Sequence, residues 1–592
     1  MKDFLKYVLA TVVGMVLVAV IGGFFMLASL LGMVAAQSQT TPIADNSVLV
    51  IKLSGALQER DNSNVISSLI GDRAPQLGLA ETVSAIQKAA KSKKVSGIYI
   101  EAGAFMPDSY ASLAALRREL QNFRKAGKWI VAYGDTYTQG AYYLASVADK
   151  VYLNPQGQID WHGLGAQPYF VKDLLAKLNI RMQVAKVGAY KSATETYTGE
   201  RMSDADRAQT TAYLAGTWKS VVDAVGQSRK LTAAQLNAYA DSLITLAAPK
   251  DYLRMRMVDG LLYTDQVKQT IKKRLGLKAD DMISQVSIND LLADTESTQE
   301  SGDEIAVYYA VGEIVDGAAA IPSNSSRIDA QKVCPDLQRL ADDKNVKAVV
   351  LRVNSPGGSA YASEQIWHQI TELKKKKPVV VSMGSYAASG GYYISAPADW
   401  IVAEPTTLTG SIGIFGMFPD VSGLLTEKLG LKFDEVKTNK HALFGTTSRP
   451  FNADEMRHLE AYIDRGYKLF RQRVADGRRM SVAEVEKIAQ GHVWLGQDAA
   501  KIKLVDQLGG LDVALAKAAK LAKLKEWHQT TYPAPADVIT QLLDIQGETS
   551  GNYLDNQLRQ SLGVYYEPFA IIRRLNAQDP VQARLPFLPN IQ

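Results

Sequence analysis

The chain has 592 residues, of which 47% are hydrophobic and 21% charged, and its formal net charge at pH 7 is +5. This length exceeds what one hydrophobic core supports and predicts at least two domains. Acidic and basic residues alternate along the chain, which excludes the clustered basic face of a nucleic-acid-binding protein. One cysteine and six scattered histidines predict neither a disulfide nor a metal site. We expect no cofactor and no nucleic-acid partner.

The N-terminal residues predict a membrane anchor. No charged residue occurs from Tyr7 to Ala36, a stretch longer than the roughly 20 apolar residues that cross a bilayer. Lys2 and Lys6 flank it and favour a cytoplasmic N-terminus, with the body on the periplasmic side of the inner membrane. A cleaved signal peptide is the alternative, but its apolar region would be only about 7–15 residues long. We expect one retained transmembrane helix in 1–36 and a linker over 37–46.

The remainder of the chain repeats itself. Residues 133–152 align with residues 383–402 at a constant shift of 250. The matching pairs are Gly134 and Gly384, Gly140 and Gly390, Tyr142–Tyr143 and Tyr392–Tyr393, and Asp149 and Asp399. Two further segments align at shifts of 251 and 247, so the register holds over both halves. The chain is therefore predicted to be a tandem duplication.

Within each copy, short β-branched segments alternate with amphipathic ones. In chain order we expect strands at 48–53, 97–101 and 129–134, a helix at 113–127, strands at 305–311, 348–353 and 379–384, and a helix at 364–377. Alternating strands and helices predict an α/β fold with right-handed crossovers. The polar stretch 292–304 is the expected linker, which gives domains at 47–291 and 305–528 and a tail at 529–592.

Three segments of the second copy are candidates for chemistry. Asn354–Ser359 (NSPGGS) follows an apolar strand, and its paired glycines would let backbone N–H groups face a pocket, as an oxyanion hole requires. Residues 385–395 (SYAASGGYYIS) predict a helix packed closely beneath such a site. Ser411 lies between glycines in 407–416 (TLTGSIGIFG), where no large side chain blocks a peptide backbone. Each segment alone also fits an ordinary turn, a packed helix or a loop.

A serine hydroxyl needs an adjacent base, and no histidine has an obvious relation to Ser411. A lysine can serve if burial lowers its pKa from about 10.4 toward 7. The first copy offers Lys191, which follows a Gly-Ala-Tyr turn in VAKVGAYKSATETY. A single lysine in a loop is ordinarily solvated, so its candidacy depends on the other segments.

Together these segments resemble the long, duplicated form of the signal peptide peptidase A (protease IV) family. The motifs are Gly-Ala-Tyr-Lys-Ser in the first copy and NSPGGS, ASGGYY and TGSIG in the second. The resemblance implies a tandem duplication of a crotonase-like (Clp protease-like) α/β domain and a Ser–Lys dyad. It implies Ser411 as nucleophile and Lys191 as general base. The N–H groups of Gly358 and Ile412 would form the oxyanion hole, and Thr438 would supply a hydroxyl beside the lysine.

The repeat independently favours a site shared between the copies. At the shift of 250, Ser411 corresponds to Trp161, and at 251 Lys191 corresponds to Ala442. The glycine pair corresponds to Met106–Pro107, and proline has no N–H to offer an oxyanion. Each copy therefore lacks what the other retains.

The resemblance implies a membrane-anchored serine endopeptidase that degrades remnant signal peptides at the lipid bilayer, as a homotetramer. Two other functions remain open on the residues alone. A crotonase-type acyl-CoA enzyme would share the fold and the oxyanion arrangement, because fold alone does not decide function. A non-catalytic membrane scaffold could keep the fold without activity. Retention of the serine, the lysine and the glycine pair favours the protease.

Overall fold

The computed structural model describes residues 42–60, 76–294, 302–317, 326–534 and 580–585, with isolated positions between 6 and 25. No helix in these described parts is long and apolar enough to cross a membrane. The anchor expected in 1–36 falls largely outside the described residues.

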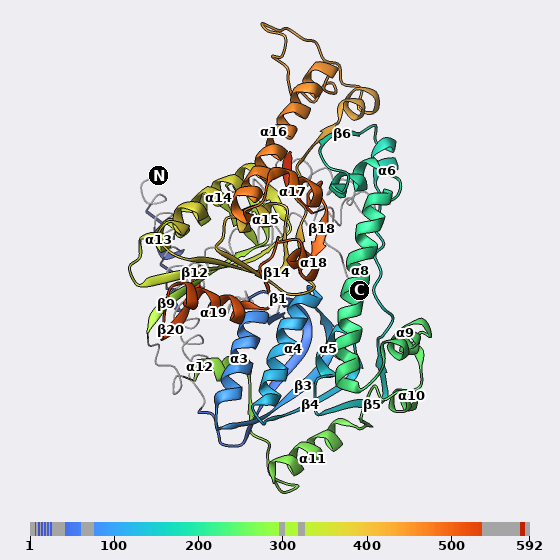
Figure 1. Cartoon of the computed structure of the whole chain (residues 1–592), viewed down its shortest axis with the longest axis vertical. Coiled ribbons are helices and arrows are strands. Elements are labelled where there is room, and N and C mark those ends of the chain that lie inside the picture. Colours follow the sequence, from blue (N-terminus) through green and yellow to red (C-terminus); the bar gives the residue numbers. More distant parts are fainter. Residues whose placement is uncertain are drawn as a thin grey trace.

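The first copy forms a parallel sheet in the order β2-β1-β3-β4-β5-β7, with β8 beside β1. The apolar alternation of β3 buries Ile98 and Ile100 in the core beneath the helices. Its strands are β1 (Ser47–Gln58), β2 (Gln76–Gly78), β3 (Val95–Met106), β4 (Trp129–Tyr137), β5 (Lys150–Ile159), β7 (Gly260–Leu261) and β8 (Gln285–Val286). Helices α3 (Leu79–Lys91), α4 (Tyr110–Lys125) and α5 (Gln139–Ala145) follow β2, β3 and β4 in the chain (Figure 1).

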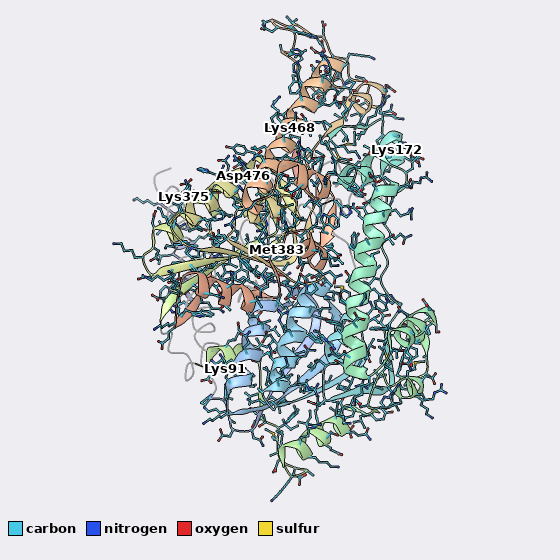
Figure 2. All side chains as sticks on the ribbon, viewed as in Figure 1. Lys91, Lys172, Lys375, Met383, Lys468 and Asp476 are labelled. Carbon is cyan, nitrogen blue, oxygen red and sulfur yellow. The ribbon has the colours of Figure 1, made fainter. Side chains whose placement is uncertain are left out.

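The second copy repeats this arrangement, with β9, β12 and β14 in the places of β1, β3 and β4. Its sheet has the order β18-β16-β14-β12-β9-β20, with β15 between β14 and β19. The strands are β9 (Asp303–Val311), β12 (Val346–Ser355), β14 (Val379–Ala388), β15 (Trp400–Ala403), β16 (Leu408–Gly410), β18 (Val493–Leu495), β19 (Gln507–Leu508) and β20 (Trp527–Tyr532). Met383 of β14 lies in the interior (Figure 2), and β20 extends the sheet across the domain boundary expected at 528.

The helices of the second copy include the equivalents of α4 and α5, which are α14 and α15. They are α13 (Ala330–Asp342), α14 (Ala360–Lys374), α15 (Gly390–Ser395), α16 (Ala453–Arg478), α17 (Val482–Ile488), α18 (Gly496–Lys501) and α19 (Leu511–Leu521). In the first copy a later set follows β5: α6 (Lys172–Lys177), α7 (Glu195–Thr198), α8 (Asp204–Arg229), α9 (Ala233–Asp241), α10 (Pro249–Arg254), α11 (Thr264–Leu275) and α12 (Ile288–Ala293). The long α8 runs beside both copies (Figure 1).

A third sheet joins the two copies and the C-terminal tail. Its order is β11-β10-β13-β21-β17-β6. The strands are β6 (Arg181–Lys186), β10 (Glu313–Val315), β11 (Arg327–Asp329), β13 (Gly357–Ser359), β17 (Phe415–Asp420) and β21 (Val581–Arg584). Strand β6 belongs to the first copy and pairs antiparallel with β17 of the second. The sheet thus carries the chain that leads to Lys191 directly to the second copy.

Two charged pairs also hold the copies together. Arg352 of β12 donates to Glu59 with Nε–Oε1 at 2.6 Å, and both side chains are 4% exposed. Arg118 of α4 donates to both carboxylate oxygens of Glu404 at 2.7 and 3.0 Å. Bidentate arginine–carboxylate pairs fix orientation as well as distance. The relative placement of the copies, on which a shared site depends, is therefore specified by polar contacts.

Candidate active site

Lys191 reaches the second copy because two glycines allow close backbone contact. Gly188 has φ 105°, and a Cβ there would lie 2.5 Å from the Gln490 carbonyl oxygen. A Cβ on Gly491 would lie 2.7 Å from the Lys191 nitrogen. The Tyr190 N–H donates to the Gln490 carbonyl at 2.9 Å. The lysine side chain is consequently inserted into the second copy and is 0% exposed.

A polar network from α8 supports the lysine loop. Ser192, the next residue, donates to Asp206 of α8 at 2.6 Å. Gln209, one turn further along, donates to the Tyr190 carbonyl at 3.2 Å and accepts from the Val493 N–H of β18 at 3.2 Å. Buried polar groups that are mutually hydrogen-bonded specify one arrangement. Helix α8 therefore fixes the loop that carries Lys191 to the second copy.

The amine of Lys191 contacts two serines. Its Nζ lies 2.8 Å from the Oγ of Ser389, 3.0 Å from the Oγ of Ser411 and 3.1 Å from the carbonyl oxygen of Ser411. Burial holds the pKa of Lys191 well below its ordinary value, and no nearby charge contributes to the shift. A lowered pKa increases the fraction of neutral amine at a given pH, and a neutral amine can accept a hydroxyl proton.

Ser389 occupies the sharp turn between β14 and α15. Its backbone has φ 54° and ψ −112°, a conformation that costs a non-glycine residue about 1–3 kcal/mol. Strained strand-to-helix turns present a nucleophile in other hydrolases. Sequence reasoning assigned 385–395 to packing. The signal that it missed is a serine flanked by alanines and glycines where a strand passes into a helix.

Ser411 lies directly after β16 and is also fully buried, with φ 50°. Its N–H donates to the His492 carbonyl at 2.7 Å. Because Lys191 contacts both its hydroxyl and its carbonyl oxygen, Ser411 holds the amine at two points. The structure thus brings the two sequence-predicted residues together, with Ser389 as a third member.

The expectation for Thr438 is wrong. Thr438 lies in the segment 427–442, every residue of which is exposed, whereas Lys191 is fully buried. The hydroxyls beside the lysine amine are those of Ser389 and Ser411. The family resemblance suggested Thr438, but this residue is exposed whereas the Lys191 amine is buried.

A slot for an extended peptide lies next to the serines. Strand β21, residues 581–584, fills it by pairing antiparallel with β13 on one side and with β17 on the other. Gly358 is opposite Ala583, and Phe415 is opposite Gln582. An added strand is held by main-chain hydrogen bonds along both edges, which is a common mode of peptide recognition.

The Ala583 carbonyl oxygen points at the glycines of the second copy. It lies 2.0 Å from where Gly357 would carry a Cβ and 3.2 Å from the same point on Gly390, so side chains there would displace it. The Leu585 N–H donates to the Pro356 carbonyl at 2.8 Å. Hydrogen-bonded pairs recur every second residue in an antiparallel ladder, so the Gly358 N–H is directed at the Ala583 carbonyl.

The two predicted oxyanion donors, Gly358 and Ile412, differ in their position relative to the peptide slot. Gly358 lies on the slot, opposite Ala583. Ile412 is buried, and its carbonyl accepts from the Gly491 N–H at 2.8 Å, on the lysine side of the site. The backbone beside the Ala583 carbonyl belongs to Gly390, the residue after Ser389.

One group of side chains in the described part of the chain could hold a metal ion. His441, Asp454 and His458 each offer a ligand atom within 4.8 Å of the others. Sequence spacing did not reveal them, because they meet only when the segment before α16 folds back on its first turns. Asp454 already pairs with Lys440 and Arg457. These side chains lie outside the buried Lys191 site.

Comparisons with known proteins place the chain among the proteases. The profile of peptidase family S49 matches residues 122–278 and again 371–525, and that of Clp protease matches 312–401. Protease 4 of Salmonella typhi is 37% identical over 512 residues, which cover 84% of this chain and 82% of the relative. Protease 4 of Haemophilus influenzae is 34% identical, covering 86% and 84%. The chloroplastic serine protease SPPA of Arabidopsis thaliana is 30% identical, covering 85% and 73%.

The fold and these relatives define a serine protease with a duplicated Clp protease-like α/β fold, and peptides are its substrates. The chain belongs to peptidase family S49. One match in each copy confirms the predicted duplication, and the relatives confirm the resemblance to protease IV. The acyl-CoA enzyme and the non-catalytic scaffold are thereby set aside.

Proposed function

We propose that this protease is a membrane-anchored endopeptidase that degrades remnant signal peptides with a Ser–Lys dyad. The observation that carries the proposal is the fully buried Lys191 amine, 2.8 Å from one serine hydroxyl and 3.0 Å from another. A serine becomes nucleophilic when an adjacent base takes its proton. Lys191 is the base because burial disfavours its charged form.

We assign the nucleophile to Ser389, in place of Ser411. Both serines touch the amine and both have positive φ, so neither contact nor strain separates them. Ser389 is followed by Gly390, which borders the peptide slot next to the Ala583 carbonyl. Ser411 holds the amine through its hydroxyl and its carbonyl. In this assignment Ser411 takes the supporting role that the family resemblance implied for Thr438.

In the proposed reaction, Lys191 first acts as a base and then as an acid. Neutral Lys191 accepts the Ser389 proton as the hydroxyl attacks the peptide carbonyl, and the N–H groups of Gly358 and Gly390 stabilise the oxyanion. The protonated lysine then returns its proton to the leaving amine. Water, deprotonated by the same lysine, releases the acyl group from Ser389. Removal of one oxyanion donor from such a site typically costs about 10²–10³ in kcat.

The proposed substrate class has two supports. The long uncharged segment over 7–36 would hold the enzyme on the membrane, where signal peptides remain after their release. The peptide strand in the slot carries Ala583 next to Gly390, and this alanine is 0% exposed, so the site favours a small residue there. Signal peptides typically offer small residues at their C-terminal ends.

We further propose a homotetramer in which each dyad forms within one chain. Lys191 and both serines meet within a single chain, so assembly does not need to supply a catalytic residue. Mixing Ser389→Ala chains with Lys191→Met chains under subunit exchange should restore no activity. Recovery of about a quarter of the wild-type activity would place each dyad between chains.

The proposed function is tested by hydrolysis of a synthetic signal peptide with purified, detergent-solubilised enzyme. Wild type is expected to cleave it, Ser389→Ala to lose cleavage, and Ser411→Ala to keep a measurable fraction of it. Lys172→Met is the control for Lys191→Met, because Lys172 is partly exposed and pairs with Glu200. Full activity in Ser389→Ala would overturn the nucleophile assignment, and no cleavage of any peptide by wild type would overturn the function.

A further inference from the structure

Two histidines and an aspartate meet at the first turns of α16. Asp454 and His458 are four residues apart on this helix, so their side chains share one face. His441 comes from the exposed segment before the helix, and its ring centroid lies 5.9 Å from that of His458. The ligand atoms of all three residues lie within 4.8 Å of one another. Three side chains that commonly bind metals therefore converge from two separate parts of the chain.

The separations suit a tetrahedral ion. Zinc binds imidazole nitrogens and carboxylate oxygens at about 2.0–2.2 Å, which places two tetrahedral ligands about 3.4 Å apart. The Nε2 of His441 lies 3.4 Å from the Oδ2 of Asp454. His458 is exposed, so its ring can turn to a similar separation without disturbing the core. Two imidazoles and one carboxylate form a zinc ligand set that leaves the fourth position to water.

A second carboxylate faces the other ring nitrogen of His441. The Nδ1 of His441 lies 4.0 Å from the Oε1 of Glu455, about 1 Å beyond a hydrogen bond. Glu455 is 1% exposed and is held by Arg449, which donates to its two oxygens at 2.8 and 2.9 Å. A metal-bound histidine ordinarily donates its second ring N–H to a carboxylate, which fixes the ring orientation and the tautomer. Glu455 is placed for that role.

The cations beside Asp454 are the competitors of a metal ion. Lys440 pairs with the Oδ2 of Asp454, and Arg457 pairs with its Oδ1. The two cationic side chains are 71% and 74% exposed. Exposed ion pairs of this kind contribute little to stability. A divalent ion held by two further ligands would therefore displace them at low cost.

We propose that His441, Asp454 and His458 bind one zinc ion, through two imidazole nitrogens and one carboxylate oxygen. Glu455 is the positioning residue that orients the His441 ring. The ion joins the exposed segment 427–442 to α16. This site is separate from the proposed peptidase reaction, and it uses none of the residues of that reaction.

The ion would also connect the segment to the sheet that joins the copies. Phe444, three residues after His441, stacks on Phe451 with the ring centroids 5.1 Å apart. Phe451 in turn packs edge-on against Phe418 of β17, with the centroids 5.2 Å apart. Zinc on His441 should therefore hold the segment in place next to these rings, and protect it from proteases.

Equilibrium dialysis against zinc at neutral pH, with untagged full-length protein in detergent, tests the proposal. Wild type should bind one zinc ion per chain that His441→Ala and His458→Ala do not bind. The loss of a ligand should weaken binding at least as much as the loss of an outer partner, about 10–100-fold. His368→Ala, which removes an exposed histidine of α14, is the matched control and should bind like wild type. Equal binding by all four proteins, or no binding by wild type, would overturn the site.

Two further variants test the surroundings of the ion. Glu455→Gln keeps a residue suited to the helix cap and should weaken zinc binding by about 10–100-fold. Lys440→Ala removes a competitor for Asp454 and should tighten binding. Unchanged affinity in Glu455→Gln would remove its positioning role, and weaker binding in Lys440→Ala would contradict the displacement.

Limited proteolysis gives a readout that does not depend on activity. Zinc should slow cleavage within 427–442 in wild type and leave it unchanged in His441→Ala. Equal cleavage of wild type with and without zinc would overturn the link between the segment and α16. Ser389→Ala should bind zinc like wild type, so a failure of the proposed peptidase reaction and a failure of the zinc site are distinguished.

Discussion

The two copies build the same strand-to-helix turn and use it differently. In the first copy the turn has an ordinary backbone, and the Thr138 side chain accepts from the Ala141 N–H as a helix cap. Gln139, at the position of Ser389, is buried and hydrogen-bonded to Tyr110 and Gly163. In the second copy Ser389 has strained dihedrals and makes no cap. The first turn is capped by its own side chain, whereas in the second the Ser389 hydroxyl accepts from Lys191 of the other copy.

The slot beside the turn differs in the same way. In the first copy a Cβ on Gly140 would lie 2.8 Å from the Pro107 ring, so the chain's own proline fills the space. In the second copy the equivalent glycine, Gly390, faces the Ala583 carbonyl of a separate strand. Replacing Gly-Gly by Met-Pro therefore closes a peptide slot without changing the fold around it. Activity depends on these few positions, and the α/β fold accommodates either Gly-Gly or Met-Pro there.

Removing the base should leave the second copy without catalytic activity, like the first. We expect Lys191→Met to lower kcat/KM for a peptide by about 10⁴-fold or more, since loss of one member of such a unit removes most of its catalysis. Thermal unfolding of the variant should remain cooperative, because methionine suits a buried site. Peptide hydrolysis within tenfold of wild type would show that another group serves as base.

Partial closure of the peptide slot in the second copy should have the next largest effect on activity. In Gly357→Ala the new Cβ would meet the position of the Ala583 oxygen at 2.0 Å, and φ is 102°. We expect kcat/KM to fall by about 10²–10³, as when an oxyanion donor is lost. Met106→Ala, the equivalent position in the first copy, is the control and should leave kcat/KM unchanged. A normal rate in Gly357→Ala would remove the slot from the mechanism.

The pH dependence should report the lysine. Only the neutral amine accepts a proton, and burial lowers the Lys191 pKa, so kcat should rise with pH through that lowered pKa and then level off. Below the pKa the rise is about tenfold per pH unit. Initial rates at saturating peptide, with chemistry shown to be rate-limiting, measure it. A rate that stays flat from pH 5 upward would contradict a lysine base.

The smallest effect concerns stability. The folded chain binds fewer protons at Lys191 than the unfolded chain between the lowered pKa and about 10.4, so stability should rise with pH in that window. The contribution is at most about 1.4 kcal/mol per pH unit. Lys191→Met should remove it, which parallel thermal melts of both proteins at several pH values would show. Identical pH slopes would mean that Lys191 stays protonated when folded.

The periodicity of the sequence was sufficient to predict the fold of the two copies. The apolar strands after each linker and the constant shift of 250 predicted two α/β copies, because buried parallel strands leave strong β-branched patterns. The first copy has Lys191 but Met106–Pro107 in place of the glycine pair, and the second copy has the glycine pair but Ala442 in place of the lysine. This complementary loss predicted a site shared between the copies. These inferences needed only residue types and their spacing.

The choice among neighbouring hydroxyls could not be made from the sequence. Ser389 and Ser411 are 22 residues apart, and only the turn at the end of β14 brings both to one amine. Thr438 has the right chemistry but lies in an exposed segment. Strand β21 was also beyond prediction, since its partners are more than 160 residues away and its four residues carry no strong pattern.

The most direct test of the central claim, a Ser389 nucleophile activated by Lys191 across the two copies, is to identify the residue that a fluorophosphonate modifies. Wild type, Ser411→Ala and Lys191→Met would be labelled at neutral pH and the adduct located by peptide mass spectrometry. We predict an adduct on Ser389 in wild type and at a reduced level in Ser411→Ala, and none in Lys191→Met. An adduct on Ser411 in wild type, with Ser389 unmodified, would contradict the account.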